Sequence, residues 1–246
     1  MNRTKIEWCQ NPDGTKGFTW NPVTGCFHGC SYCYARRFAE TRLRGRCGYP
    51  ADDPFRPTFR RDRLYEPLQV KKPSRIFVSS MGDLFGEWVP AKWIQDVIDV
   101  CKLNEKRHNG GASRHTFIFL TKNPARYAEF DFPPNCWLGA TVTSGDDWTG
   151  YVRNHYGALT RTATYNVFFL SWEPILDYDW YWDYTPKFDW LIMGAMTGPK
   201  AKQHRPDPGW IEAAVRACRW RDISIFTKDS IAPYHELIRE WPERRS

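Results

Sequence analysis

The stretch Gly25-Cys26-Phe27-His28-Gly29-Cys30-Ser31-Tyr32-Cys33-Tyr34 places three cysteines within eight residues. Their spacing is C-x3-C-x2-C, and an aromatic residue precedes the last cysteine. Three clustered thiolates suit a [4Fe–4S] cluster, which usually takes four cysteine ligands. The stretch holds no fourth cysteine, so one iron of such a cluster would be left open for another ligand. The spacing therefore predicts a cluster site on Cys26, Cys30 and Cys33.

A structural zinc ion is the main alternative for the same residues. The three cysteines with His28 would form a Cys3His set, which is a known tetrahedral zinc site. Zinc sites usually combine a C-x2-C pair with a second, distant pair, and no distant Cys/His pair completes one here. The other cysteines are scattered and are expected to fill space: Cys9, Cys47, Cys101, Cys136 and Cys218.

Disulfides are the least favoured interpretation of these cysteines. Residues 1–10 lack the apolar core of a signal peptide, so we expect a cytoplasmic protein whose thiols stay reduced. No apolar run approaches the ~20 residues that span a bilayer, and no membrane partner is expected. At 246 residues the chain has a length at which α/β barrels commonly form one domain.

The positive charge of the chain is concentrated in one segment. Between Arg36 and Arg75, twelve Lys/Arg accompany five Asp/Glu, and this surplus of seven equals that of the whole chain. Clustered basic residues gain affinity by neutralising phosphates, so the segment predicts a nucleic acid or nucleotide partner. A solvated surface that keeps the protein soluble is the alternative. The arginines dense enough to follow a phosphate backbone are Arg42, Arg44, Arg46, Arg60, Arg61 and Arg63.

Short apolar runs alternate with helical patterns along the chain. The runs resemble parallel strands covered on both faces, and they lie at 18–24, 75–80, 116–121, 136–142, 167–171, 190–194 and 223–227. Apolar residues at helical spacing follow Pro90, Asp207-Pro208 and Pro233. Repeated β–α units predict right-handed crossovers and a parallel sheet. We therefore predict an α/β fold, a partial or full parallel (β/α) barrel of about six to seven strands, as one domain over residues 1–246.

Polar residues follow the predicted strands at their carboxyl ends, the edge at which such barrels place their chemistry. The first strand leads into the three cysteines. The later strand ends carry Ser79, Ser80, Asp83, Lys122, Thr141, Thr143, Ser144, Glu173 and Lys228. Any one of these residues could be a cap or a turn. Polar groups at every strand end nevertheless predict a functional edge.

Six segments, in collinear order over nearly the whole chain, are similar to those of a known family. They are Thr4-Lys5-Ile6-Glu7-Trp8, Thr19-Trp20-Asn21-Pro22-Val23-Thr24-Gly25-Cys26, Met81-Gly82-Asp83-Leu84-Phe85, Leu120-Thr121-Lys122-Asn123-Pro124, Ser171-Trp172-Glu173-Pro174 and Asp189-Trp190-Leu191-Ile192-Met193-Gly194. The chain thereby resembles a phage-associated family with the three-cysteine motif of the radical SAM superfamily, mostly without assigned function. Two late stretches depart from its pattern. Gly194-Ala195-Met196 stands where the family tends to show Gly-Gly-Glu, and Lys228-Asp229-Ser230 where it tends to show Lys-Gln-Trp-Gly.

The resemblance implies a mechanism. An electron donor such as flavodoxin or ferredoxin would reduce the cluster, and bound S-adenosylmethionine would be cleaved to a 5′-deoxyadenosyl radical. That radical would take a hydrogen atom from the substrate. The resemblance also implies roles for the polar residues. Tyr32 would border the adenine, and the methionine ammonium would lie at Ser79, Ser80 and Asp83, or alternatively at Glu173. The ribose hydroxyls would be bound by Thr141, Thr143 and Ser144, and the substrate by Lys122, Glu173 and Lys228.

A phage-type radical enzyme with a basic segment points to DNA, RNA or a nucleotide as substrate. Rearrangement of a hypermodified thymine and repair of a lesion would both fit, in the host cytoplasm if the protein is phage-encoded. The aromatic and acidic stretch 172–190 would face an extruded base, or would pack on itself. A hypothesis from another class is a zinc-stabilised nucleic-acid-binding module without catalysis. That module would use the cysteines, His28 and the arginines, but it would leave the polar strand ends without a role.

Overall fold

The structure, a computed structural model, describes residues 1–106, 115–147, 165–178 and 188–243. The centre of the aromatic stretch, residues 179–187, lies outside these described residues. The chain divides into two compact units. Unit 1 comprises Met1–Thr121 and Phe130–Cys136, and unit 2 comprises Lys122–Glu129 and Trp137–Ser246. The prediction of a single domain stays a prediction.

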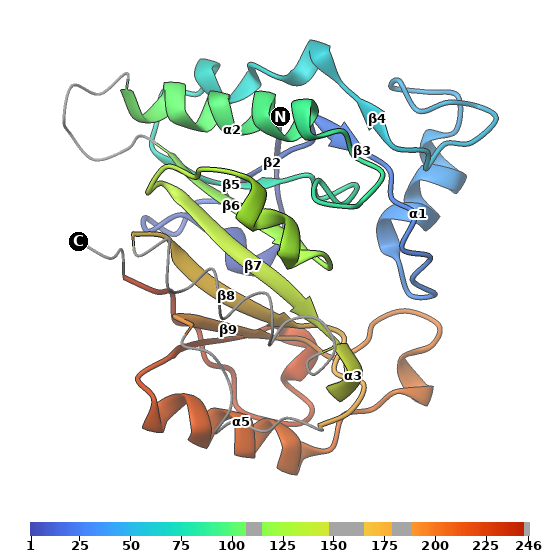
Figure 1. Ribbon diagram of the computed structural model, residues 1–246. Coiled ribbons are helices and arrows are strands. Elements are labelled where there is room, and N and C mark those ends of the chain that lie inside the picture. Colours follow the sequence, from blue (N-terminus) through green and yellow to red (C-terminus); the bar gives the residue numbers. More distant parts are fainter. Residues whose placement is uncertain (107–114, 148–164, 179–187, 244–246) are drawn as a thin grey trace. The chain divides into compact units, whose positions relative to one another are not determined.

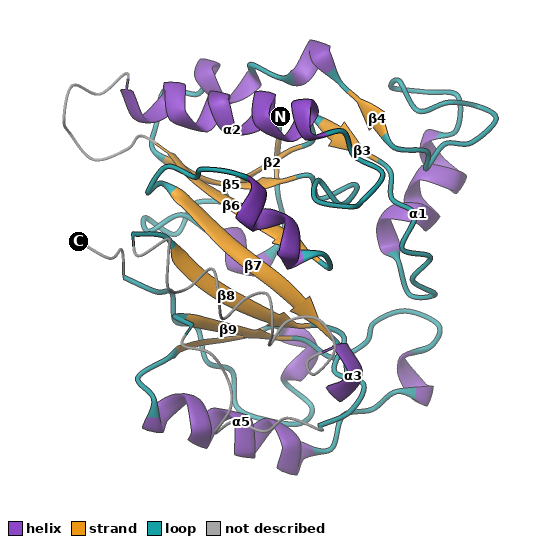
Figure 2. Cartoon of the chain, viewed as in Figure 1, coloured by secondary structure: helices purple, strands orange, loops and turns teal. Residues whose placement is uncertain are grey.

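The fold is mixed α/β with a mostly parallel sheet, as predicted, and four strands of that sheet lie largely in each unit (Figure 2). Unit 1 has the strand order β1-β2-β5-β6, with bounds β1 (Asn2–Arg3), β2 (Phe18–Trp20), β5 (Ser74–Val78) and β6 (His115–Thr121). β2, β5 and β6 are parallel, and β1 joins β2 antiparallel. The short strand β1 was not predicted.

The strand predicted over residues 18–24 is wrong in its second half. β2 ends at Trp20, and β3 (Val23–Thr24) pairs antiparallel with β4 (Thr58–Phe59) in a separate two-stranded sheet. Pro22 lies between the two strands, and a proline has no N–H to donate to a sheet. The chain therefore leaves the main sheet before it reaches the cysteines.

Helix α2 (Ala91–Lys106) packs against β6 in unit 1, and Figure 1 shows it lying beside the strands of that unit. Its predicted apolar face is buried, with Ile94, Val97, Ile98 and Cys101 fully shielded from solvent. α1 (Tyr34–Phe38) follows the cysteines and continues into a π-helical turn over Ala39–Leu43. Short 3-10 helices lie at Glu7–Cys9, Arg61–Arg63, Glu66–Gln69, Pro124–Glu129, Ala201–Gln203 and Asp229–Ile231.

Unit 2 contains the parallel strand order β7-β8-β9-β10. The strands are β7 (Cys136–Val142), β8 (Val167–Trp172), β9 (Trp190–Met193) and β10 (Ser224–Thr227). The predicted helix after Asp207 is α5 (Pro208–Trp220), which packs on β10. The Asp207 side chain accepts a hydrogen bond from Gly209 N at 2.7 Å, the N-cap that its sequence predicts. α3 (Gly145–Asp147) is a single turn after β7.

The helix predicted from Pro233 is wrong, because the chain turns at residues 233–235 and then runs along β10. Arg239 pairs antiparallel with Phe226, and Glu240 N donates to Ile225 O at 2.9 Å. The outer edge of β10 carries backbone donors and acceptors that need partners, and this segment supplies them. In this segment Tyr234, Ile238 and Trp241 are half-buried and Leu237 is exposed, so the apolar spacing does not mark a buried helical face. Periodicity over such a short run does not distinguish a helix from other structure.

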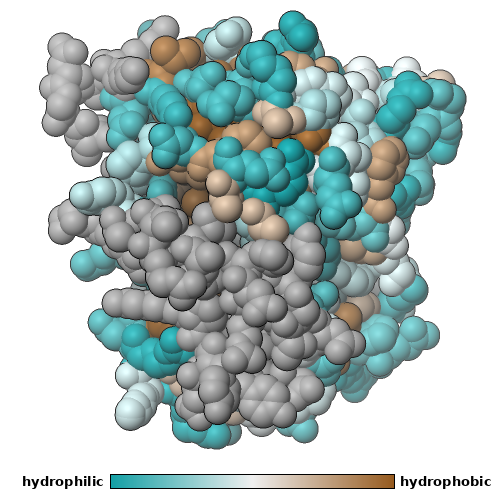
Figure 3. Space-filling model, viewed as in Figure 1, coloured by the Kyte–Doolittle hydropathy of each residue, from teal (hydrophilic) through white to brown (hydrophobic). Residues whose placement is uncertain are grey.

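Hydrophilic residues, drawn teal in Figure 3, cover most of the described surface in that view, and hydrophobic residues show only in small areas. Within the described part of the chain, none of the helices has the length and apolar character needed to cross a bilayer.

Candidate functional site

The loop that carries the cysteines starts in close backbone contact with the turn after β5. Gly25 forms a parallel bridge to Gly82, and Gly25 N donates to Met81 O at 2.8 Å. A Cβ on Gly82 would lie 2.6 Å from Gly25 O, which is closer than real Cβ contacts. Gly25 itself has a φ of +87°, a conformation open mainly to glycine. Two glycines thus allow the first cysteine to be placed against a strand end.

Side chains tie the same turn, residues 79–83, to both ends of the loop. Asn21 Oδ1 accepts from Met81 N at 2.9 Å and from Ser80 Oγ at 3.2 Å. From the other end, Tyr34 Oη donates to Ser80 O at 2.6 Å. Ser79 is buried with a φ of +57°, and its Oγ has no hydrogen-bond partner among the described residues. A strained residue with an unpaired buried hydroxyl is a feature of functional sites, so Ser79 stays a candidate ligand contact.

Asp83 lies at the centre of a hydrogen-bonded chain that the sequence did not reveal. Its Oδ2 is 2.9 Å from Nε2 of His28, inside the cysteine loop. Its Oδ1 accepts from the Thr121 hydroxyl at 2.7 Å and from Phe85 N at 3.0 Å. Asp83 is only 6% exposed, and the Trp88 ring packs edge-on against His28. The chain thus links the cysteine loop to the ends of β5 and β6.

The three thiols of the loop are free and half-buried. Backbone N–H groups approach two of them, from His28 to Cys26 Sγ at 3.4 Å and from Arg36 to Cys33 Sγ at 3.3 Å. Burial, together with the nearby Asp83 carboxylate and the other two thiols, raises the pKa of the Cys26 thiol to about 12. Clustered thiols that receive N–H hydrogen bonds fit the ligand set of an iron–sulfur cluster. As the side chains lie, no three His, Cys, Asp or Glu residues among those described are grouped to hold a metal ion.

The cysteines outside the loop follow the prediction with one exception. Cys9, Cys101, Cys136 and Cys218 are buried and fill space. Cys47 is exposed, so the space-filling prediction is wrong for it. It lies in a loop of unit 1 with a φ of +50°, where the residue faces solvent and not a core.

In unit 2, the ends of β8, β9 and β10 gather two of the predicted charged residues. Lys228 Nζ forms an ion pair with Glu173 Oε1, and the side chains are 22% and 28% exposed, respectively. Both lie over Gly194, where an added Cβ would come within 3.0 Å of Glu173 and 3.1 Å of Lys228. Ser230 Oγ accepts from Ala195 N at 3.1 Å, so the two stretches that depart from the family pattern are in contact. Lys122 is half-buried after β6.

The hydroxyls predicted to bind a ribose also serve local structure. The Thr143 hydroxyl and its backbone N both donate to Asp147 Oδ2, the latter at 2.9 Å. Ser144 Oγ accepts from Asp147 N at 3.4 Å. These contacts cap α3, so the cap interpretation holds for Thr143 and Ser144. Thr141 lies half-buried within β7, and a ribose contact by any of the three stays a prediction.

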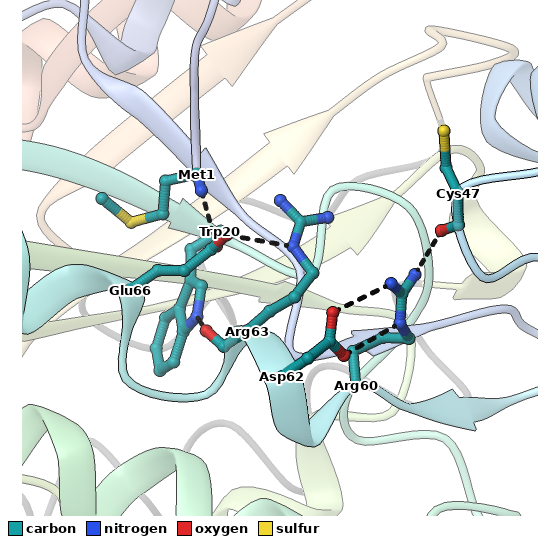
Figure 4. Close-up of polar contacts among 7 residues, drawn as sticks. All are labelled: Met1, Trp20, Cys47, Arg60, Asp62, Arg63 and Glu66. Carbon is teal, nitrogen blue, oxygen red and sulfur yellow. Dashed lines mark hydrogen bonds and ion pairs between the residues drawn. The ribbon is translucent and has the colours of Figure 1, made fainter.

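Part of the charge of the basic segment is neutralised within unit 1. Figure 4 shows Arg60 between Asp62 and the carbonyl of Cys47, with Nη1 2.7 Å from that oxygen. In the same figure Arg63 and the amino group of Met1 both lie against the Glu66 carboxylate. The side chains of Arg60 and Arg63 are only 13% and 19% exposed. These two arginines are already paired within the segment, and a contact of either with a phosphate backbone stays a prediction.

Other arginines of the segment remain at the surface. Arg44 donates to the carbonyls of Ala51 and Asp52, and Arg61 lies over the Phe59 ring. Arg37, Arg42 and Arg46 are exposed in and after α1. In the part of the chain that the structure describes, none of these three has a carboxylate within ion-pair distance. They are the arginines of the segment best placed to meet a polyanion.

Comparison of the sequence with protein families gives one match, which runs from residue 3 to residue 236 and is described as a protein of unknown function (DUF5131). The chain belongs to this family. No curated protein matches its sequence. The phage association expected from the resemblance stays a prediction for this DUF5131 member.

Solved structures of spore photoproduct lyase share the fold. A cysteine-to-serine mutant of that protein superposes with a TM-score of 0.59 at 11% identity, covering 93% of this chain and 80% of the other. A complex of the lyase with dinucleoside spore photoproduct gives a TM-score of 0.54 at 12% identity, covering 92% and 81%. At this identity the likeness shows the fold, a radical SAM-like (β/α) arrangement, for this DUF5131 protein.

Proposed function

We propose that the protein is a radical SAM enzyme that acts on a base within a nucleic acid or a nucleotide. The observation that carries the proposal is the cysteine loop. Three free thiols at C-x3-C-x2-C spacing are held against the carboxyl ends of parallel strands in a radical SAM-like fold. Catalysis in such folds belongs to this edge of the strands.

In this proposal Cys26, Cys30 and Cys33 would hold a [4Fe–4S] cluster, which would serve to bind S-adenosylmethionine. The chemistry that these cofactors supply is one-electron cleavage of S-adenosylmethionine, which gives a radical able to remove hydrogen from unactivated carbon. The protein would bind the cofactor and the substrate, orient them toward each other and keep water out of the site. Ser79, whose buried Oγ lacks a partner within the described part of the chain, is the residue of the β5 turn best prepared to donate to a ligand.

Asp83 is less free to bind the ammonium of S-adenosylmethionine than the sequence implied. Its two oxygens already accept from His28, Thr121 and Phe85 N. A carboxylate has about four lone-pair positions, so the ammonium would have to share the Asp83 oxygens with these donors. In the alternative in which Glu173 meets the ammonium, its carboxylate would be shared between the ammonium and Lys228.

The substrate class rests on two independent features. The fold is shared with a lyase that has been solved in complex with dinucleoside spore photoproduct. The chain also carries the exposed arginines Arg37, Arg42 and Arg46 immediately after the cysteine loop. Both features favour a nucleotide-containing substrate, and repair of a base lesion is the first reaction to test. Lys228 and Glu173 are proposed to contact that substrate, with Lys122 as the third charged group.

Anaerobic reconstitution with iron and sulfide tests the proposal. The protein should bind about four irons with matching sulfide, and with dithionite it should convert S-adenosylmethionine to 5′-deoxyadenosine. Ultraviolet-irradiated oligonucleotides and unirradiated controls should then be compared for product formation by mass spectrometry. Stoichiometric zinc in protein purified without oxygen, together with no 5′-deoxyadenosine, would instead support the zinc-stabilised module.

A further inference from the structure

Arg36 is the residue that connects the first and the third cysteine of the loop. Its guanidinium Nη2 donates to the carbonyl oxygen of Cys26 at 2.9 Å. Its backbone N donates to the sulfur of Cys33 at 3.3 Å. One residue therefore holds the peptide of one predicted cluster ligand and the thiol of another. Arg36 was not among the site residues predicted from the sequence.

The surroundings of Arg36 fix its positive charge near the loop. Its guanidinium lies over the Phe55 ring, 4.9 Å from the centroid, and its side chain is 34% exposed. Phe55 is buried in a small cluster that also includes Cys26 and Cys33 at its margin. The nearest carboxylate is Glu40, whose Oε1 is 3.6 Å from Nη1. That distance exceeds a hydrogen bond, so Glu40 offsets the charge of Arg36 only in part.

We propose that Arg36 is a positioning residue that braces Cys26 against Cys33, and that its charge raises the reduction potential of the cluster. The inference rests on the proposed function. A cluster held by three thiolates becomes more negative when it takes an electron. A guanidinium stays protonated at every physiological pH and therefore favours the reduced form. Net charge and hydrogen bonds to the sulfurs are among the factors that set such potentials.

Three variants separate the brace from a general charge effect. Arg36→Gln removes the charge and shortens the donor. Arg37→Gln removes the same charge one residue along, from a side chain at the surface, and is the matched control. Glu40→Gln removes the carboxylate that partly offsets Arg36. The midpoint potential of each reconstituted protein is measured by redox titration, with the electron paramagnetic resonance signal of the reduced cluster as readout.

Arg36→Gln should lower the ratio of reduced to oxidised cluster at fixed potential about tenfold, which is about 59 mV for one electron. Glu40→Gln should shift the potential in the opposite direction, and Arg37→Gln should leave it near that of the wild type. Arg36→Lys, which keeps the charge, should restore the potential. If Arg36→Gln fails to bind iron while Arg36→Lys binds it, the brace is supported, and Glu40→Gln still tests the charge.

An unshifted potential in both Arg36→Gln and Glu40→Gln would overturn the inference while leaving the proposed function intact. Equal shifts in Arg36→Gln and Arg37→Gln would also overturn it, because the effect would not depend on the contact with Cys26. Wild-type protein that holds no cluster after anaerobic reconstitution would overturn the proposed function and the inference together.

Discussion

The cysteine loop of unit 1 and the strand ends of unit 2 both carry predicted functional residues, but they are held in different ways. The loop is fixed largely through backbone, by the Gly25–Gly82 bridge and by hydrogen bonds to Met81 O and Phe55 O. The β8 and β10 ends meet through a side-chain ion pair between Glu173 and Lys228. A cofactor site must keep its geometry through many turnovers, whereas a substrate contact can adjust. The comparison predicts that the cysteine loop tolerates substitution far less than the strand ends of unit 2 do.

The largest effect is expected from removing a thiol of the loop. Cys30→Ala should abolish 5′-deoxyadenosine formation and lower the iron content sharply, because two thiolates do not hold the cluster. Cys47→Ala, at the exposed cysteine outside the loop, is the control and should retain both. Iron and sulfide analysis with chromatographic detection of 5′-deoxyadenosine measures the two outcomes. Full activity of Cys30→Ala would show that the loop does not bind the cofactor.

A methyl group at Gly25 should destabilise the site, because it would clash with neighbouring backbone atoms. Its Cβ would lie 2.3 Å from Arg56 O, in addition to the cost of the positive φ. Gly25→Ala should lower the free energy of unfolding by about 3 kcal/mol or more. Gly14→Ala is matched, because Gly14 has a φ of +79° and no atom of the described residues lies within 4 Å of an added Cβ. Gly14→Ala should lower the free energy of unfolding by only about 1–2 kcal/mol. Urea titrations give both values, and equal losses would contradict the close packing.

The His28–Asp83 contact can be separated from a direct role of Asp83 in cofactor binding. If Asp83 binds the ammonium, Asp83→Asn should weaken S-adenosylmethionine binding roughly tenfold to a hundredfold, the loss of a charge-assisted hydrogen bond of ~1.5–3 kcal/mol. His28→Gln should then have little effect on that affinity. If Asp83 acts by holding the loop, the two single variants and the double variant should show similar losses. Calorimetric titration of reconstituted protein distinguishes the two patterns.

In unit 2, the ion pair should matter for activity more than for stability. Glu173→Gln should change the free energy of unfolding by no more than about 1 kcal/mol, because solvent-accessible pairs contribute little. Turnover of a nucleotide substrate should nevertheless fall at least tenfold. The control is Glu212→Gln, which breaks an exposed pair with Arg216 on α5 and should alter neither quantity. Unchanged turnover in Glu173→Gln would remove this pair from the site.

The smallest effect per residue is expected at the exposed arginines. If Arg37, Arg42 and Arg46 bind phosphates, the log–log slope of affinity against salt should change by about 0.7–0.9 for each arginine–phosphate pair removed. Replacing all three by Glu should flatten the slope and spare S-adenosylmethionine cleavage without substrate. Arg216→Glu is the control at an exposed site in unit 2. A steep slope that survives the triple substitution would place the polyanion elsewhere.

The parallel sheet and the cysteine loop could be predicted because their signals are local. Six of the apolar runs lie within a few residues of β5 to β10, and Asp207 caps α5 as its sequence indicates. The contact between His28 and Asp83 could not be predicted in the same way, since 55 residues separate the partners. The convergence of strand ends predicted that His28 and Asp83 lie at the same edge of the sheet, but it did not predict that their side chains are in contact. The contact between His28 and Asp83 depends on the backbone bridge between Gly25 and Gly82. Hydrophobic periodicity in the sequence does not predict such a bridge.

Two errors have a similar cause. Residues 18–24 and the segment after Pro233 both have apolar spacing that fits a regular element. Backbone hydrogen bonding determines the structure of both segments. Pro22 has no N–H to continue the first strand, and the open edge of β10 pairs with the second segment. The ion pairs of Arg60 and Arg63 could not be predicted, because composition counts charges and does not show their partners.

The extended segment along β10 has a consequence for how the protein behaves at high concentration. An uncovered outer strand can template pairing with a second molecule and so promote aggregation. Here Arg239 bridges to β10, and Glu240 is held by Arg219 and by the indole N–H of Trp190. Removing residues 236–243 should therefore lower solubility before it lowers helix content. Purification tags at that end belong after a spacer that leaves Glu240 in place.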